Sequence, residues 1–260
     1  MKKKLKLSNR NRESISIILD IQKNQEGLVF IMHGLGGFKE QEQVQAFAAP
    51  FKEKKFTTIV FDARNTFGES QGNYEEANAT NYFQDLEDVI SWAKKQEWYQ
   101  EPFYLAGHSL GGLCILLYTE KFPEKIKAIV PISTVVSGKL LIAAYPQESL
   151  EEWERTGWRI SPSNSRQGVI KKLKWPQFKE DILKYDVTKK ISLLNMPVLL
   201  IVGEKDTTHK EDQERLYKLL PGEKELHIIK DAEHTFHKEQ EFKQIKKILN
   251  DWIPRVEKAC

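Results

Sequence analysis

Residues 103–112 read Phe-Tyr-Leu-Ala-Gly-His-Ser-Leu-Gly-Gly, and this stretch decides the fold. Its apolar start is typical of a strand that is buried on both faces. The following Gly107-His108-Ser109-Leu110-Gly111 matches the pattern G-x-S-x-G and leads into residues with helical spacing. Such a pentapeptide occurs often by chance, but between a buried strand and a helix it predicts a sharp turn that presents Ser109. Glycine two positions to either side leaves room where larger side chains would collide.

The rest of the chain alternates between strand and helix patterns. Such alternation predicts an α/β protein whose mostly parallel central sheet is covered by helices on both faces. Residues 3–20 are predicted to form an antiparallel hairpin, and a helical stretch is expected after each of the last two strands. The other predicted strands are 28–32, 58–61, 103–106, 126–132, 197–202 and 225–229, and the other predicted helices are 42–54, 81–95 and 111–121.

Residues 134–190 break this alternation. The segment holds Trp153, Trp158 and Trp175, and its 11 Lys and Arg against 7 Asp and Glu give it a net charge of +4. We interpret it as a small, mainly helical insertion over one edge of the sheet. Residues 1–133 and 191–260 would then form the core domain. The insertion is either a structural excursion with its own tryptophan cluster or a cap that shapes a substrate pocket.

A serine hydroxyl at the turn needs a neighbouring base, which is normally a histidine oriented by a carboxylate. On this type of fold the order along the chain is serine, acid, histidine. His234 follows the strand predicted at 225–229 in a loop, so we predict it as the base. His237 is its rival, but a last helix starting near Thr235 would turn it away. His227 alternates with apolar neighbours inside a strand and is interpreted as a packed or surface residue.

The predicted acid is Asp206, in the loop Gly203-Glu204-Lys205-Asp206 after the strand predicted at 197–202. Glu204 is a near rival that lies closer to the strand end than the loop geometry favours. Asp231 and Glu233 are interpreted as helix-capping or solvated charges.

Acyl transfer also requires donors for the oxyanion that forms on the attacked carbonyl. The backbone N–H of Leu110, directly after the serine, is one predicted donor. The glycine-rich loop His33-Gly34-Leu35-Gly36-Gly37 follows another buried strand, and the N–H of Leu35 is predicted as the second. This loop has neither the dinucleotide-binding nor the Walker spacing, so no nucleotide cofactor is expected. A metal site at His234 and His237 lacks further ligands at convincing spacing, so no metal is expected.

Composition excludes several other classes of protein. The 260 residues carry 40 Lys and Arg against 37 Asp and Glu, a net charge of +3, which gives no general basis for nucleic-acid or membrane binding. No apolar run approaches the roughly 20 residues that span a bilayer. Cys114 and Cys260 cannot make a dense disulfide framework. We therefore expect a cytoplasmic protein acting on a small molecule, and the sequence leaves open whether it forms a homodimer.

Taken together, these motifs resemble the α/β-hydrolase superfamily over nearly the whole chain. The Gly34–Glu40 run and the Phe67-Gly68-Glu69-Ser70 turn look most like small bacterial esterases, including cinnamoyl and feruloyl esterase relatives with an inserted cap. Leu35 departs from those relatives, which often carry an aromatic there, and Asn65 stands where many have glycine. The resemblance implies a Ser-Asp-His triad. Asp62 and Arg64 are expected to form an ion pair that supports the loop beneath the site.

The sequence therefore predicts a serine hydrolase that cleaves carboxylic esters of small to medium acyl groups through an acyl-enzyme, without metal or organic cofactor. Serine aminopeptidase or amidase activity and monoacylglycerol lipase-like activity are alternatives, as is a non-catalytic binding protein. The positive insertion argues against recognition of a substrate ammonium. It suits a substrate that carries a carboxylate or phosphate, although a solvated lysine face explains the charge equally well.

Overall fold

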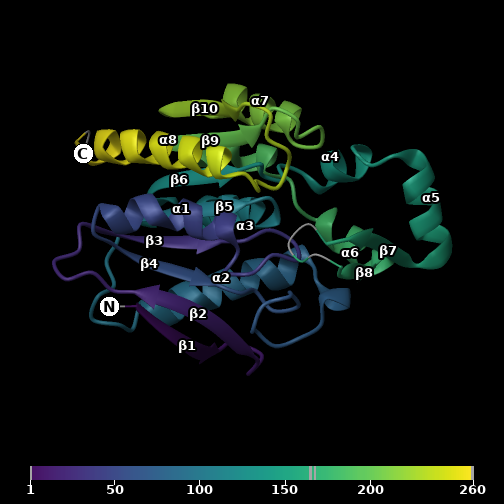
Figure 1. The fold of residues 1–260 in the computed structure, drawn as a ribbon, viewed down its shortest axis with the longest axis horizontal. Coiled ribbons are helices and arrows are strands. Elements are labelled where there is room, and N and C mark those ends of the chain that lie inside the picture. Colours follow the sequence, from purple (N-terminus) through teal and green to yellow (C-terminus); the bar gives the residue numbers. More distant parts are fainter. Residues whose placement is uncertain (1, 164–165, 167, 259–260) are drawn as a thin grey trace.

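The computed structural model describes residues 2–163, 166 and 168–258, and its centre is an eight-stranded sheet (Figure 1). In chain order the strands of this sheet are β1 (Lys2–Ser8), β2 (Ser14–Asp20), β3 (Gly27–Met32), β4 (Phe56–Phe61), β5 (Phe103–His108), β6 (Ile126–Ile132), β9 (Val198–Gly203) and β10 (Lys224–Ile229). They lie side by side in the order β1-β2-β4-β3-β5-β6-β9-β10. β2 pairs antiparallel with β1 and β4, and the other neighbouring pairs are parallel. The predicted mostly parallel sheet is confirmed.

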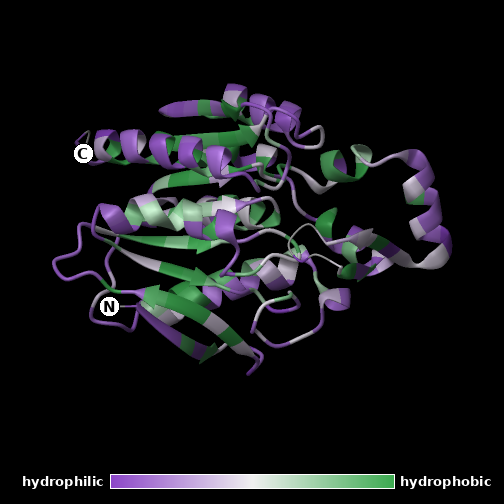
Figure 2. Ribbon diagram, viewed as in Figure 1, coloured by the Kyte–Doolittle hydropathy of each residue, from purple (hydrophilic) through white to green (hydrophobic). Residues whose placement is uncertain are grey.

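Helices cover both faces of the sheet, as the alternating pattern predicts. α1 (Glu42–Glu53) and α8 (Glu239–Lys258) pack on one face, where Phe47 and Ile245 join the same apolar cluster. α2 (Ala79–Ala93), α3 (Leu110–Lys121) and α7 (Lys210–Leu219) contribute Leu86, Leu113 and Leu216 to the cluster on the other face. Figure 2 shows strands that are largely hydrophobic, and a helix such as α8 in which hydrophilic and hydrophobic residues alternate. Short 3-10 helices, η1 (Tyr74–Glu76) and η2 (Pro123–Lys125), lie in the connections.

Several central strands are buried along their whole length, which explains their continuous apolar runs. Every residue of β3, β4, β5 and β9 is buried. A parallel strand with helices on both faces has no solvent side, so apolar residues do not alternate with polar ones. The parallel strands all end at the same edge of the sheet, and the loops after β3, β5, β9 and β10 meet there. Ligand sites of open α/β sheets form at this edge.

The described residues of the segment 134–190 project beyond that edge (Figure 1). They form α4 (Gly138–Ala143), α5 (Gln147–Thr156), β7 (Trp158–Pro162), β8 (Ile170–Lys174), α6 (Trp175–Ile182) and the start of η3 (Val187–Leu193). Trp153 and Trp175 pack with ring centroids 4.8 Å apart, and Tyr145 packs against both. The segment is therefore not purely helical, since β7 and β8 pair as an antiparallel hairpin that its sequence pattern did not indicate.

The last helix starts at Glu239 and not near Thr235, so His237 precedes it; its side chain is exposed and does not line the cavity. Cys114 is buried in α3, whereas Cys260 lies outside the described residues. Within the described part of the chain, every helix is too short or too polar to cross a membrane.

Candidate active site

Ser109 lies on a strained turn between β5 and α3. Its backbone angles are φ 55° and ψ −117°, a region that side-chain-bearing residues seldom occupy. A Cβ on Gly107 would lie 2.5 Å from the carbonyl oxygen of Gly111, and one on Gly111 would lie 2.4 Å from that of His33. A larger residue at position 107 would therefore force the turn open, and one at position 111 would push the turn away from the end of β3. The collision argued from the sequence holds in the folded chain.

The turn brings Ser109 to the side chains of His234 and Asp206. Ser109 Oγ lies 3.0 Å from His234 Nε2, and His234 Nδ1 lies 2.9 Å from Asp206 Oδ2. His234 comes from the loop after β10, and Asp206 comes from the loop after β9. The hydroxyl can donate to Nε2 only if the ring carries its proton on Nδ1, and the carboxylate favours that tautomer by accepting from Nδ1. The three residues chosen from the sequence thus form one hydrogen-bonded chain.

Asp206 is buried and also binds His209, which the sequence analysis did not assign to the site. Asp206 Oδ1 accepts from the His209 backbone N–H at 3.1 Å and lies 3.2 Å from His209 Nδ1. Burial by itself would raise the pKa of Asp206, but the hydrogen bonds from His209 and His234 outweigh it and hold the pKa well below its usual range. Asp206 therefore stays ionised at working pH.

The His234 ring lies between two other histidine rings. His209 stacks on it with centroids 4.3 Å apart and planes 17° apart, and His108 lies 4.9 Å away on centroids. His108 Nε2 donates to the carbonyl oxygen of His234 at 2.8 Å, while its Nδ1 is buried without a hydrogen-bond partner. Burial lowers the pKa of His108 to about 3, so its ring is neutral. The sequence indicated only that His209 lies three residues after Asp206, and therefore near the predicted acid; it did not indicate that the two rings stack.

The rival residues lie elsewhere. Glu204 is exposed and accepts from the backbone N–H of Asp231, which in turn pairs with Lys205. His227 is half-buried on β10 and lies 3.0 Å from Glu225. Asp206, His209 and His234 can each offer a ligand atom within 4.8 Å of the others, and His237 is not part of this group. The Nδ1 atoms of both rings, however, are engaged by the carboxylate.

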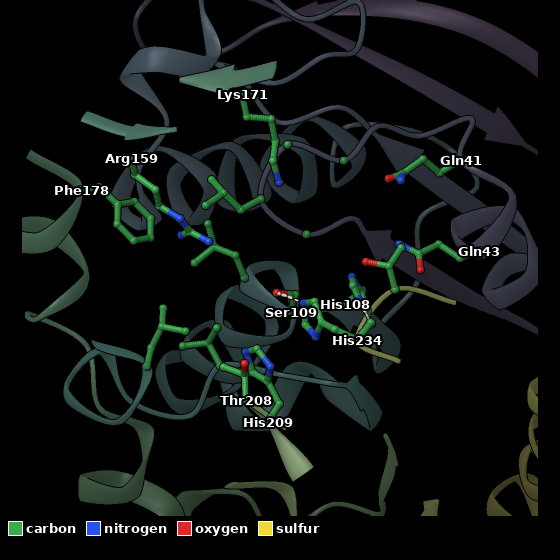
Figure 3. Close-up of a pocket in the computed structure, with 18 of the residues that line it drawn as sticks. Gln41, Gln43, His108, Ser109, Arg159, Lys171, Phe178, Thr208, His209 and His234 are labelled. Atoms are coloured by element: carbon green, nitrogen blue, oxygen red, sulfur yellow. Dashed lines mark hydrogen bonds between the residues drawn. The ribbon is translucent and has the colours of Figure 1, made fainter. Parts of the chain in front are cut away.

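A cavity of about 290 Å³ opens above Ser109 (Figure 3). Leu35 and Leu110, the residues predicted to supply oxyanion donors, both line it. Leu110 is the first residue of α3, so its N–H has no acceptor within the helix. A Cβ on Gly34 would lie 2.9 Å from Ser109 Cβ, so the loop after β3 passes directly beside the serine. The segment 134–190 supplies part of the wall through Val135, Leu141, Tyr145, Arg159, Lys171 and Phe178.

The expected ion pair between Asp62 and Arg64 is wrong. Buried Asp62 pairs with the buried ammonium of Lys39 at 2.7 Å and also accepts from the Lys39 backbone N–H. Arg64 turns the other way and pairs with Asp85 at 2.9 Å. Each charge instead finds a partner that is distant in sequence, 23 residues away for Asp62 and 21 for Arg64. Both pairs tie the segment after β4 to neighbouring elements, to the connection before α1 through Lys39 and to α2 through Asp85.

Several solved structures have the same fold as this chain. Est1E from Butyrivibrio proteoclasticus, in a structure with bound ferulic acid, superposes with a TM-score of 0.81 at 19% identity, covering 98% of this chain and 99% of that one. Mouse α/β-hydrolase domain-containing protein 10 gives 0.78 at 19%, with the same coverage. The esterase domain of a Rhodothermus marinus protein gives 0.72 at 18%, covering 98% of each chain. The fold is that of an α/β hydrolase.

A comparison of the sequence with models of protein families identifies the family of this chain. The model of the family described as serine aminopeptidase, S33, matches residues 23–172, which is more than half of the chain, and the protein belongs to that family. An Escherichia coli protein, named as an uncharacterized 31.7 kDa protein in the traX-finO intergenic region, is 26% identical over 261 residues, covering 88% of this chain and 90% of its own.

Proposed function

We propose that this protein is a serine hydrolase that cleaves carboxylic esters of small to medium acyl groups through an acyl-enzyme. The observation that carries the proposal is the hydrogen-bonded chain from Ser109 Oγ to His234 and on to Asp206, at 3.0 and 2.9 Å. The α/β-hydrolase fold and the family membership support it.

In the first half of the reaction, Ser109 Oγ attacks the acyl carbon while its proton passes to His234 Nε2. Ionised Asp206 stabilises the imidazolium that forms and keeps the ring oriented. The stacked ring of His209 restricts how far His234 can rotate. Backbone N–H groups of Leu35 and Leu110 would bind the oxyanion, and each well-placed donor lowers the barrier by about 3 kcal/mol.

In the second half, the imidazolium returns its proton to the leaving alcohol, and the alcohol departs. Water then enters, His234 accepts its proton, and the hydroxide attacks the acyl carbon of the ester on Ser109. The acid is released and Ser109 regains its proton. The apolar side chains of Val135, Leu141 and Phe178 in the cavity wall suit an acyl or alcohol group of modest length.

The family description raises the alternative of an aminopeptidase. Such an enzyme needs a negative group to bind the ammonium of its substrate. The described residues that line the cavity include no Asp or Glu, and they include the cations Arg159 and Lys171. The charge of the cavity therefore favours ester hydrolysis over amino-terminal peptide cleavage.

The experiment compares the wild-type protein with Ser109→Ala, and with Ser91→Ala as a control at an exposed serine on α2. We expect hydrolysis of 4-nitrophenyl butyrate and covalent labelling by a fluorophosphonate in the wild type and the control, and neither in Ser109→Ala. Full activity in Ser109→Ala would remove Ser109 from the mechanism. A folded wild-type protein that neither hydrolyses esters nor takes the label would favour a non-catalytic binding protein.

A further inference from the structure

The hairpin β7–β8 has an unusual pattern of inward and outward side chains. Arg159 lies opposite Leu173 in the pairing, and Lys171 lies opposite Ser161, so both cations lie on one face. That face turns toward the cavity, where Figure 3 shows both side chains pointing in from the hairpin. The isoleucines on the opposite face, Ile160 and Ile170, are 52% and 57% exposed. A hairpin that only needed solubility would point its charges outward and its isoleucines inward.

Arg159 is held firmly by groups that do not neutralise its charge. Its Nη1 donates to Tyr145 Oη at 2.9 Å, and its guanidinium lies 4.7 Å from the Tyr145 ring centroid and 5.2 Å from that of Trp153. Its Nε is buried without a hydrogen-bond partner. The side chain therefore keeps a fixed position in the wall of the cavity with donor capacity left over.

Lys171 lies beside the loop that carries Leu35. A Cβ built on Gly36 would be 3.5 Å from Lys171 Cδ, so the lysine stem passes over that loop. Burial, and then repulsion by Arg159, lower the pKa of Lys171 to about 8. η1 packs against β8 and carries Glu76, but Glu76 pairs with Lys174 on the same strand.

Among the described residues, neither cation has an ion-pair partner, although the sequence is rich in acidic residues. Two partly buried positive charges that repel each other are unfavourable without a counter-ion. A negative group bound between them would relieve the repulsion and use the free donors. Lys172, which follows Lys171 on β8, is exposed and lies on the outward face of the hairpin. Exposure to solvent therefore explains Lys172 but not Arg159 and Lys171, which line the cavity.

We propose that Arg159 and Lys171 form a carboxylate-binding subsite, so that the substrates are small esters that retain a free carboxylate. This deepens the function proposed above and rests on it. The carboxylate would lie at the hairpin side of the cavity while the ester carbonyl lies at Ser109. It can belong to the acyl part, as in a monoester of a dicarboxylic acid, or to the alcohol part, as in an ester of a hydroxy acid.

The test uses two pairs of esters that differ only in charge. For the acyl part they are 4-nitrophenyl hydrogen adipate and 4-nitrophenyl methyl adipate, and for the alcohol part they are 4-acetoxybenzoate and its methyl ester. We expect the wild type to prefer the anion by at least tenfold in kcat/KM in one pair, which also identifies the side of the ester. The ratio of anionic to neutral ester should fall about tenfold in Lys171→Gln and in Arg159→Gln, and stay unchanged in Lys172→Gln. Equal rates within both pairs, or a preference that survives Lys171→Gln, would overturn the proposal.

A binding measurement separates this proposal from the hydrolytic one. In Ser109→Ala protein, titration calorimetry should detect monomethyl adipate more strongly than dimethyl adipate, and Lys171→Gln in that background should abolish the difference. If no ester is hydrolysed but this difference is present, the hydrolytic proposal fails and the subsite stands. If neutral esters are hydrolysed and monomethyl adipate shows no advantage in binding or turnover, the subsite fails and the hydrolase stands.

Discussion

Replacing Asp206 by asparagine should switch the tautomer of His234. The oxygen of the new amide would stay at the Oδ1 position, because the His209 N–H groups at 3.1 and 3.2 Å require an acceptor there. The amide nitrogen would then face His234 Nδ1, which would have to accept and so lose its proton to Nε2. A protonated Nε2 in a neutral ring cannot take the proton of Ser109. The base would be disabled although every side chain keeps its place.

The size of the effect follows from the lost charge. With charge centres about 4 Å apart and an effective dielectric constant near 20, the carboxylate stabilises an imidazolium by about 4 kcal/mol. At about 1.4 kcal/mol per tenfold in rate, this corresponds to a decrease of about a thousandfold in kcat. The tautomer change acts in the same direction, so this figure is a lower bound.

The assay is steady-state hydrolysis of 4-nitrophenyl butyrate at pH 7.5, with circular dichroism to check that the variant is folded. Glu204→Gln is the matched control, because Glu204 lies in the same loop, is exposed and accepts only from the Asp231 N–H among the described contacts. We expect the control to stay within about twofold of wild type. A folded Asp206→Asn protein that loses less than tenfold, or a Glu204→Gln protein that loses as much, would refute the reasoning.

Three further predictions concern the neighbouring groups. His209→Phe keeps an aromatic ring in the stack but removes the Nδ1 donor to Asp206, a charge-assisted hydrogen bond worth about 1.5 kcal/mol. We therefore expect kcat to fall about tenfold while KM changes little. A change confined to KM would contradict this prediction. The pKa of His108 is lowered to about 3 in the folded protein, so the folded state loses stability as pH falls from about 6.5 toward 3. His108→Gln should therefore remove about 2 to 3 kcal/mol of the loss in unfolding free energy between pH 7 and pH 4.5. Urea unfolding at pH 7 and pH 4.5 measures this loss, and an equal loss in the wild type and the variant would count against the prediction. The preference for anionic esters should fall as pH rises through about 8, where Lys171 beside Arg159 loses its proton, and a preference constant from pH 6.5 to 9.5 would exclude Lys171 as its source.

The sequence determined the features of this protein that depend on local rules. A strand buried on both faces requires a continuous apolar run, and β3, β5 and β9 each have one. The turn at Ser109 requires glycine at position 107, because a Cβ there would lie 2.5 Å from the carbonyl oxygen of Gly111 in the same turn. The residues that follow the parallel strands must meet at one edge of the sheet, so the loops holding Asp206 and His234 could be chosen from strand ends alone.

Only the tertiary structure decided which side chains become partners within that frame. Asp62 pairs with Lys39 and Arg64 with Asp85, and proximity in the sequence suggested the wrong pair. His209 lies on the His234 ring because the loops after β9 and β10 converge, and no periodicity encodes that convergence. The face of the β7–β8 hairpin that meets the cavity depends on how residues 134–190 pack over the sheet edge. Hydropathy would have turned its isoleucines inward, because a sequence pattern records how apolar a residue is but not which neighbours its face will meet.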